Sequence, residues 1–432
     1  KKKIMKITKI TPIVTMPIDG LPWLFVQIDT DEGISGIGEC TDYYSNGHLV
    51  RGINALEPVI LGMEAGQIEN IWQTIFHRFD DLNGRGYVSH LISAIDIALW
   101  DIKGKSLGVP IYELLGGPVR DRVPLYTHVQ DFNSGAGGPD TVAKAAKMTK
   151  DAGYEAIKTD PFPTLCLTHQ SGFECLTDKK KNAGVKTTVM HCSNSYEFSG
   201  PSEVERLTPR SIRESVEWMD AIRSAVGSDF ELMVDAHARF DVASAISAGK
   251  ALERFDLTWL EEPIHVENHN ALRQVRENVN IPLCVGERHF TRWDYIEILN
   301  KRLVDYIMPD VAWCGGISEL RRIAAQAEVQ YIRISPHDAL GPVSIAAGFQ
   351  VCMTTPNLYR QECLHTWFDT FEQIITPMFN VKNGSILPNG LPGLGMELKM
   401  DYVEKYRVHP DTQTYLNINA NSVQDATGTW LR

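Results

Sequence analysis

Residues 231–263 read ELMVDAHARFDVASAISAGKALERFDLTWLEEP. The runs ELMVD and LTWLEE have the length and apolar content of buried strands, and the segment between them suits a helix. Asp235 and Glu261 stand where the two runs end. A strand, a helix and a second strand predict a βαβ unit with parallel strands, which places both carboxylates at one edge of the sheet.

The same alternation continues along most of the chain from residue 123 onward. Helical stretches separate eight short apolar runs, and one of these stretches has Thr208 as N-cap, Pro209 in the first turn and Gly227 at its end. The runs are VPLYTHV, EAIKTD, ELMVDAH, LTWLEEP, PLCVGER, VDYIMPD, YIRISPHD and LYRQECL. Eight buried strands separated by helices predict a parallel sheet closed into a TIM-type barrel.

The ends of the chain differ from this pattern. Three apolar runs, KITKITPIV, LPWLFVQIDT and GISGIGEC, predict an antiparallel meander, and a helix follows that ends at Gly108. The tail from about residue 376 is rich in Gly and Pro and is expected to pack back on the first domain. We therefore expect an α+β capping domain at 1–122, a barrel at 123–375 and a C-terminal segment at 376–432.

Composition excludes several classes of protein. A length of 432 residues fits two domains, and a net charge of −12 argues against nucleic acid or an anionic membrane as the main partner. The eight cysteines form no CxxC pair and indicate reduced thiols of a cytosolic protein. No apolar stretch is long enough for a signal peptide or a membrane span, so we expect a cytoplasmic protein.

One long segment breaks the barrel rhythm. Residues 161–207 follow the second barrel strand and hold no clear periodicity. Loops of this length are uncommon unless they act as lids or are disordered, and this one leaves the strand end where barrel active sites are built. We expect a lid over the site; an insertion that serves packing or assembly is the alternative.

One ionisable residue stands at the end of almost every barrel strand, and from Asp235 onward the intervals are about 25 residues, which is the length of one strand–helix unit. These residues are Lys158, Asp235, Glu261, Glu287, Asp310, His337 and Glu362. Three carboxylates crowded into one pocket repel each other unless a cation or protons neutralise them. Oxygen ligands without Cys or His suit Mg²⁺, so Asp235, Glu261 and Glu287 predict one Mg²⁺ per subunit, and a zinc hydrolase is disfavoured.

The remaining strand-end residues suggest acid–base roles. A carboxylate beside an imidazole fixes its tautomer, so Asp310 and His337 together suggest a general base. His237 shares a strand face with Asp235 and could protonate a leaving hydroxyl. Lys158 could balance a substrate carboxylate. Glu362 could donate to a developing enediolate if its pKa were raised enough to keep it protonated, although a structural role is as well supported.

Two more residues are candidates near the ring. Asp160 shares the face of Lys158 two residues earlier, and we expect it to contact substrate. Arg288 is a candidate for substrate contact or for support of the acidic cluster beside Glu287.

The segments VDAHARF, WLEEP, GERHFTR, MPDVAWCGGISE, SPHDALGP, RQE and LPGLGMEL resemble the mandelate racemase subgroup of the enolase superfamily. Within it the chain is most similar to galactonate dehydratase-type sugar acid dehydratases, and mannonate dehydratases are expected to be a weaker match. The resemblance implies a (β/α)7β barrel with a cap completed by the C-terminal tail, a sugar acid substrate and a homo-oligomer. It implies the same metal ligands, base and acid as above, Glu362 as the electrophilic carboxylate, and a specificity loop at Asp42 to His48.

One position departs from this pattern. Racemases of the subgroup carry Lys-x-Lys at the second strand, whereas the second lysine is here Asp160, which disfavours two-base racemisation. We therefore expect α-proton removal by His337 followed by loss of the 3-hydroxyl to give a 2-keto-3-deoxy acid. An epimerase or cycloisomerase using the same enediolate, and a non-catalytic barrel that binds metal and sugar acid, are the alternatives.

Overall fold

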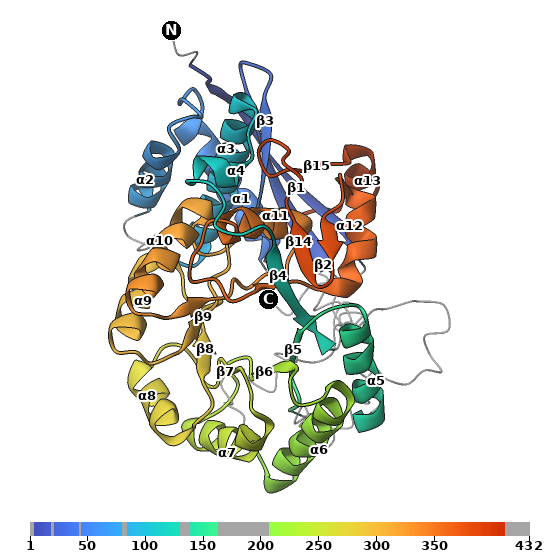
Figure 1. Cartoon of the computed structure of the whole chain (residues 1–432). Helices are drawn as coiled ribbons and strands as arrows, with labels where there is room; N and C mark the ends of the chain where they lie inside the picture. The colour runs from blue at the N-terminus through green and yellow to red at the C-terminus, as the bar shows by residue number, and fades with distance from the viewer. Residues whose placement is uncertain are drawn as a thin grey trace, which may run out of the picture.

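The computed structural model describes residues 4–18, 21–42, 45–79, 84–129, 138–162 and 207–410. It consists of a cap formed by both ends of the described chain and a barrel formed by its middle (Figure 1). The segment predicted as a lid, 161–207, lies almost entirely outside the described residues.

The cap begins with an antiparallel meander of three strands, as predicted. They are β1 (Ile7–Ile18), β2 (Leu21–Thr30) and β3 (Ser35–Glu39). The first strand is longer than expected. It runs through Pro17 to Ile18, and the pairing register with β2 shifts between Thr15 and Ile18.

Four helices follow this meander, and the first and third of them contact its strands directly. They are α1 (Asn46–Ile60), α2 (Ile68–Arg78), α3 (Tyr87–Leu107) and α4 (Ile111–Leu114). As predicted, α3 ends at Gly108, which adopts a left-handed conformation. Glycines in β3 let the strand lie directly on α3: a Cβ on Gly38 would come within 1.9 Å of the Ala94 carbonyl oxygen.

The barrel has the predicted (β/α)7β order. Its strands are β4 (Val123–His128), β5 (Ala156–Thr159), β6 (Glu231–Asp235), β7 (Trp259–Glu261), β8 (Leu283–Val285), β9 (Tyr306–Ile307), β10 (Arg333–Ile334) and β11 (Gln361–Glu362). The helices between them are α5 (Gly138–Asp151), α6 (Pro209–Val226), α7 (Val242–Leu252), α8 (His269–Asn278), α9 (Thr291–Asn300), α10 (Gly316–Val329) and α11 (Pro342–Cys352), with the 3₁₀ turn η4 (Glu253–Phe255) after α7.

Neighbouring barrel strands are parallel from β4 to β10, and β11 pairs in parallel with β4. A parallel bridge between Ile334 and Leu358 links β10 to the segment before β11 and completes the ring. The predicted start of α6 is confirmed: the Thr208 hydroxyl accepts from the Ser211 N–H, and Pro209 follows in the first turn.

After β11 the chain returns toward the cap. The elements of this segment are η5 (His365–Trp367), α12 (Phe368–Ile374), β12 (Ile375–Thr376), β13 (Asn380–Lys382), β14 (Ser385–Leu387), β15 (Glu397–Leu398) and α13 (Met400–Lys405). Strand β14 pairs with β4, and the backbone after α13 bonds to β1, with Val408 N–H donating to the Val14 carbonyl (Figure 1). The bounds of the three expected domains stay a prediction.

Buried carboxylates join the cap to the barrel. Glu39, at the end of β3, accepts from the N–H groups of Gly341 and Ser344 at the start of α11, at 2.7 and 2.9 Å. Asp96, in α3, accepts from the N–H and hydroxyl of Ser318 at the start of α10, at 3.0 and 2.6 Å. Cap side chains therefore satisfy the N-terminal N–H groups of two barrel helices.

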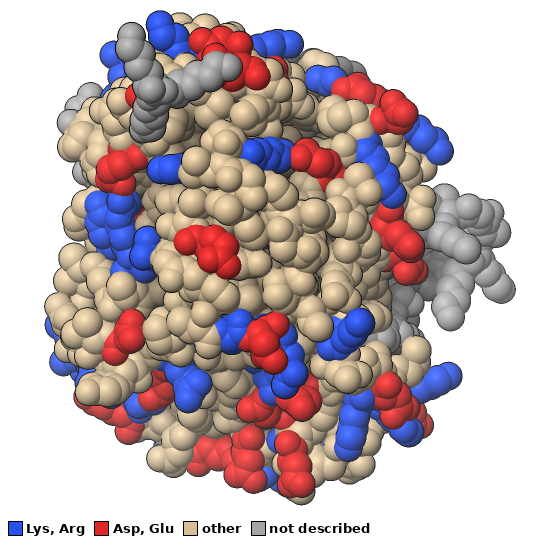
Figure 2. All heavy atoms as spheres, turned by 45° about the horizontal axis from the view of Figure 1, so that its top comes forward, with Lys and Arg blue, Asp and Glu red and all other residues tan. Residues whose placement is uncertain are grey.

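Basic and acidic side chains are interspersed over the face in Figure 2, without an extended patch of one sign. Among the described helices, none combines the length and apolar character that crossing a bilayer requires. The five described cysteines are all free and buried: Cys40, Cys284, Cys314, Cys352 and Cys363.

Candidate active site

The candidate site is the polar layer directly above the apolar floor of the barrel. Six buried residues, one from or next to each of β4 to β9, form this floor: Tyr126, Ala156, Met233, Trp259, Cys284 and Met308. Side chains two residues apart on a strand share a face. The next layer toward the carboxyl ends therefore holds His128, Lys158, Asp235 and Glu261, and each has polar contacts in this layer.

The three predicted metal ligands lie close together. Asp235 and Glu261 are register partners on β6 and β7, and their carboxyl groups are hydrogen-bonded to each other. Glu287 follows β8 by two residues and is near enough for its charge to act on both. All three are buried, and Glu261 is fully so. The indole N–H of Trp259 donates to Glu261 at 2.9 Å from the floor.

Lys158, on β5, supplies positive charge to this cluster. Its Nζ lies 2.7 Å from Glu261 Oε1, 2.7 Å from Glu362 Oε1 and 3.4 Å from Asp235 Oδ2. Burial acts to lower the pKa of this amine, but Glu261 and Glu362 raise it well above its usual value. Lys158 is therefore an ammonium held between the acidic cluster and the last barrel strand.

Lys158 alone does not neutralise the negative charge of the three carboxylates. Burial and the nearby Asp235 raise the pKa of Glu261 well above its usual range, even with Lys158 in contact. In the part of the chain that the structure describes, no three His, Cys, Asp or Glu side chains already stand in the arrangement of a metal site. The donor set nonetheless suits a hard cation, because it consists of three buried carboxylates whose charge demands neutralisation.

His337 and Asp310 are brought together as predicted. A parallel bridge joins their backbones, and His337 Nδ1 lies 2.6 Å from Asp310 Oδ2. The Nε2 atom points to the acidic cluster, 3.2 Å from Glu287 Oε2. Burial acts to lower the pKa of His337, but Glu287, Glu362 and Asp310 raise it to about 9. The indole of Trp313 packs against the imidazole with ring centroids 5.2 Å apart.

His237 lies in the same layer, beside Asp235. Its Nε2 atom is 3.2 Å from Asp235 Oδ2, and its backbone N–H donates to Asp235 Oδ1 at 2.7 Å. Its Nδ1 atom is 3.0 Å from Oδ2 of Asp160, which also pairs with Arg239. Asp160, expected to contact substrate, is thus engaged with protein side chains.

Glu362 was expected to act as a proton donor only if its pKa were raised, and in the structure the pKa is lowered instead. Burial acts to raise its pKa, but Lys158 and His337 outweigh burial and hold the pKa well below its usual range. Its carboxylate accepts from Lys158 and from the Asp338 N–H, and it lies 2.5 Å from Nε2 of His128. Glu362 is therefore an ionised acceptor in this arrangement.

His128 is a site residue that the sequence interpretation missed. It is the last residue of β4, as Asp235, Glu261 and Glu362 are the last residues of β6, β7 and β11. Extending the rule of one such group per strand to the first strand would have found it.

The other predicted contacts are less direct. Arg288 forms ion pairs with Glu287 and Glu262, which supports the acidic cluster. Asp42 is near enough for its charge to act on His90, whose ring stacks on Trp313 at 5.6 Å. His48 is exposed on α1, and no described contact joins its imidazole to the strand-end layer.

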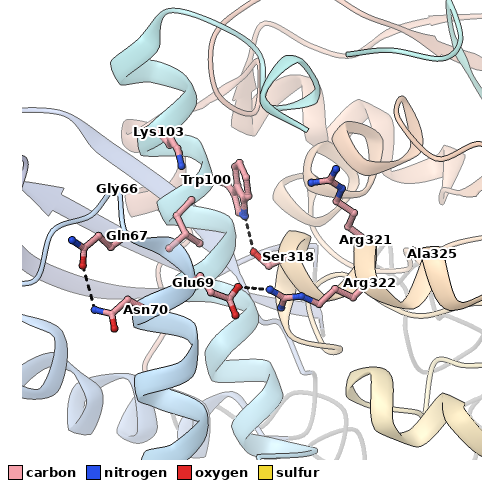
Figure 3. A pocket seen from close by; sticks show the side chains of 11 residues that line it. Gly66, Gln67, Glu69, Asn70, Trp100, Lys103, Ser318, Arg321, Arg322 and Ala325 are labelled. Atoms are coloured by element: carbon pink, nitrogen blue, oxygen red, sulfur yellow. Dashed lines mark hydrogen bonds and ion pairs between the residues drawn. The ribbon is translucent and has the colours of Figure 1, made fainter. Parts of the chain in front are cut away.

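A crevice of about 600 Å³ lies elsewhere, where α2 and α3 of the cap meet α10 of the barrel (Figure 3). Trp100 donates to the Ser318 hydroxyl, and Glu69 pairs with Arg322 across it. It shares no lining residue with the strand-end layer, so its size alone does not make it the active site.

Comparisons with known proteins agree with this fold. Residues 8–116 match the model of the mandelate racemase/muconate lactonizing enzyme N-terminal domain, and residues 140–402 match the enolase C-terminal domain-like model. A D-mannonate dehydratase of Caulobacter vibrioides is 32% identical over 423 residues, covering 96% of this chain and 98% of the relative.

Two further similarities extend this picture. A D-galactonate dehydratase of Verminephrobacter eiseniae is 30% identical over 414 residues, covering 94% of this chain and 96% of the relative. A crystal structure of an enolase superfamily member from Salmonella Typhimurium superposes with a TM-score of 0.80 at 32% identity, covering 93% of this chain and 98% of that one. The mannonate dehydratase is no weaker a match than the galactonate dehydratase, contrary to expectation.

Proposed function

Because the chain belongs to the mandelate racemase/muconate lactonizing enzyme family of the enolase superfamily, we propose that it is a Mg²⁺-dependent sugar acid dehydratase. Relatives named mannonate and galactonate dehydratase support this reaction class. The observation that carries the proposal is the pair of imidazoles, His237 and His337, whose Nε2 atoms each lie 3.2 Å from a carboxylate of the same buried cluster.

Asp235, Glu261 and Glu287 would hold the Mg²⁺, which when bound supplies positive charge that makes the proton beside a substrate carboxylate more acidic. Lys158 offsets the negative charge that the substrate brings into this buried site. His337, oriented by Asp310, removes the α-proton through Nε2 once the negative charge around the imidazole is offset.

The second half of the reaction uses the other imidazole. His237 donates a proton to the 3-hydroxyl group, which leaves as water. The enol that remains becomes a 2-keto-3-deoxy acid. Asp160 in the position of the racemase lysine favours this elimination over two-base racemisation.

The test is an activity screen of aldonic and aldaric acids with the Mg²⁺-loaded protein, measuring formation of a 2-keto-3-deoxy product. His337→Asn should abolish turnover of the substrate found. Activity of this variant close to wild type would refute the assignment of the base. Exchange or inversion at C2 in deuterated water without loss of the 3-hydroxyl would favour an epimerase instead.

A further inference from the structure

The carboxylate of Asp160 is held by protein groups on several sides. It follows the end of β5, and Nη2 of Arg239 lies 2.8 Å from its Oδ1 and 2.7 Å from its Oδ2. The N–H of Phe162 donates to Oδ1 at 3.1 Å. Its Oδ2 atom also lies 3.0 Å from Nδ1 of His237. A carboxylate with this many partners has a fixed orientation and little capacity left for a substrate.

Arg239 is itself anchored. Its side chain is almost fully buried, its Nε–H donates to the Ala236 carbonyl at 3.1 Å, and its guanidinium lies 5.7 Å from the ring centroid of Phe240. A buried guanidinium keeps its charge and needs an anionic partner. Arg239 and Asp160 therefore form a rigid pair behind His237.

The same arrangement occurs a second time in the barrel. His337, after β10, is held through Nδ1 by Asp310 after β9, at 2.6 Å. His237, after β6, is held through Nδ1 by Asp160 after β5. In both pairs the carboxylate comes from the preceding strand, and Nε2 is left facing the acidic cluster.

The backbone at His237 explains why this support matters. His237 and Ala238 have φ values of 50° and 58°, in the left-handed region that non-glycine residues rarely adopt. Hydrogen bonds from these two N–H groups to Asp235 and Glu262 maintain the turn. This turn fixes the position of the His237 backbone, from which the side chain extends. A hydrogen-bond partner on Nδ1 is needed to fix the rotation and the tautomer of the imidazole.

We propose that Asp160 is a positioning residue for the acid step, which orients His237 so that Nε2–H points at the leaving hydroxyl. This inference rests on the proposed function, and it replaces the expectation that Asp160 binds substrate. Arg239 in turn fixes the Asp160 carboxylate by pairing with both of its oxygens. The two imidazoles then have equivalent supports but opposite tasks: one removes a proton and the other delivers one.

The two half-reactions give a test. In deuterated water, α-proton exchange reports on His337, and formation of the 2-keto-3-deoxy acid reports on both imidazoles. Asp160→Asn should lower the dehydration kcat by about 10²- to 10³-fold, since general acid catalysis contributes about 10²- to 10⁴-fold. The exchange rate should not fall, because an enediolate that cannot lose the 3-hydroxyl returns to the acid with deuterium at C2, and the KM should stay within about threefold. Asp310→Asn is the matched control, and it should slow exchange and dehydration together.

The buried guanidinium could unfold the single variant, so the double variant Asp160→Asn/Arg239→Gln, which removes both charges, is measured beside it. It should show the same separation of exchange from dehydration. Equal loss of both half-reactions in a folded variant, or a raised KM with unchanged kcat, would overturn the positioning role. Absence of both exchange and dehydration in the wild-type protein across the acid panel would overturn the proposed function, and this inference with it.

Discussion

Replacing Glu39 with alanine tests whether the contact between the cap and the start of α11 stabilises the folded protein. Glu39 is fully buried and accepts from Gly341, Ser344 and the Thr41 hydroxyl. The alanine variant leaves two backbone N–H groups of α11 without an acceptor. A buried unsatisfied donor costs about 1–3 kcal/mol, so we expect Glu39→Ala to lower the free energy of unfolding by about 4 kcal/mol.

The effect should depend on pH. Burial raises the pKa of Glu39 to about 7, from 4.5 for an unperturbed glutamate. Between these values the folded state keeps a proton that the unfolded state has released, so stability from this group falls as pH rises through that window. The difference corresponds to about 3 kcal/mol. Glu39→Gln, which does not titrate, should therefore lose less relative to wild type at pH 8 than at pH 5.

Urea unfolding followed by tryptophan fluorescence at pH 5 and pH 8 measures both effects. Glu113→Ala, on an exposed residue of α4, is the matched control and should change the free energy of unfolding by less than about 0.5 kcal/mol. A Glu39→Ala variant within about 1 kcal/mol of wild type, with an unchanged pH slope, would refute the role of this carboxylate.

Three further outcomes are expected. Thr208→Ala should lower the free energy of unfolding by about 1 kcal/mol through loss of the α6 N-cap, with kcat unchanged; a larger loss in urea unfolding would contradict this. Lys158→Met leaves Glu261 and Glu362 without their cation and should lower the free energy of unfolding by about 3–5 kcal/mol and abolish turnover, measured by urea unfolding and product formation. Dialysis against a chelator should remove activity and lower the melting temperature, and added Mg²⁺ should restore both; full activity after chelation would contradict the Mg²⁺ requirement.

The strands and the positions of their ionisable residues could be predicted because each βα unit is local in sequence. An apolar run that ends in Asp235 or Glu261 predicts a strand and its ionisable end from a few neighbouring residues. The interval of about 25 residues between such ends predicts one helix between successive strands. The same reasoning found the caps of α6, because Thr208 and Pro209 act within one turn.

The interactions between units could not be predicted in the same way. Whether Asp160 faces a substrate or Arg239 depends on side chains that come together only when the barrel closes. The charge state of Glu362 depends on the sum of Lys158, His337 and burial, which no local pattern contains. Contacts such as Glu39 with Gly341 join segments about 300 residues apart in the chain, so the tie between cap and barrel needed the structure.

The order of the strands has a stereochemical consequence. β6 and β10 lie four places apart in a ring of eight, on opposite walls of the barrel. Imidazoles carried by these walls reach a bound molecule from opposite sides, so under the proposed roles hydrogen and hydroxyl depart in an anti elimination. An open-chain acid must then rotate about C2–C3 until both bonds are antiperiplanar. This rotation sends the rest of the carbon chain in different directions for erythro and threo diastereomers, so under the proposed roles we expect the site to distinguish the relative configuration at these two carbons.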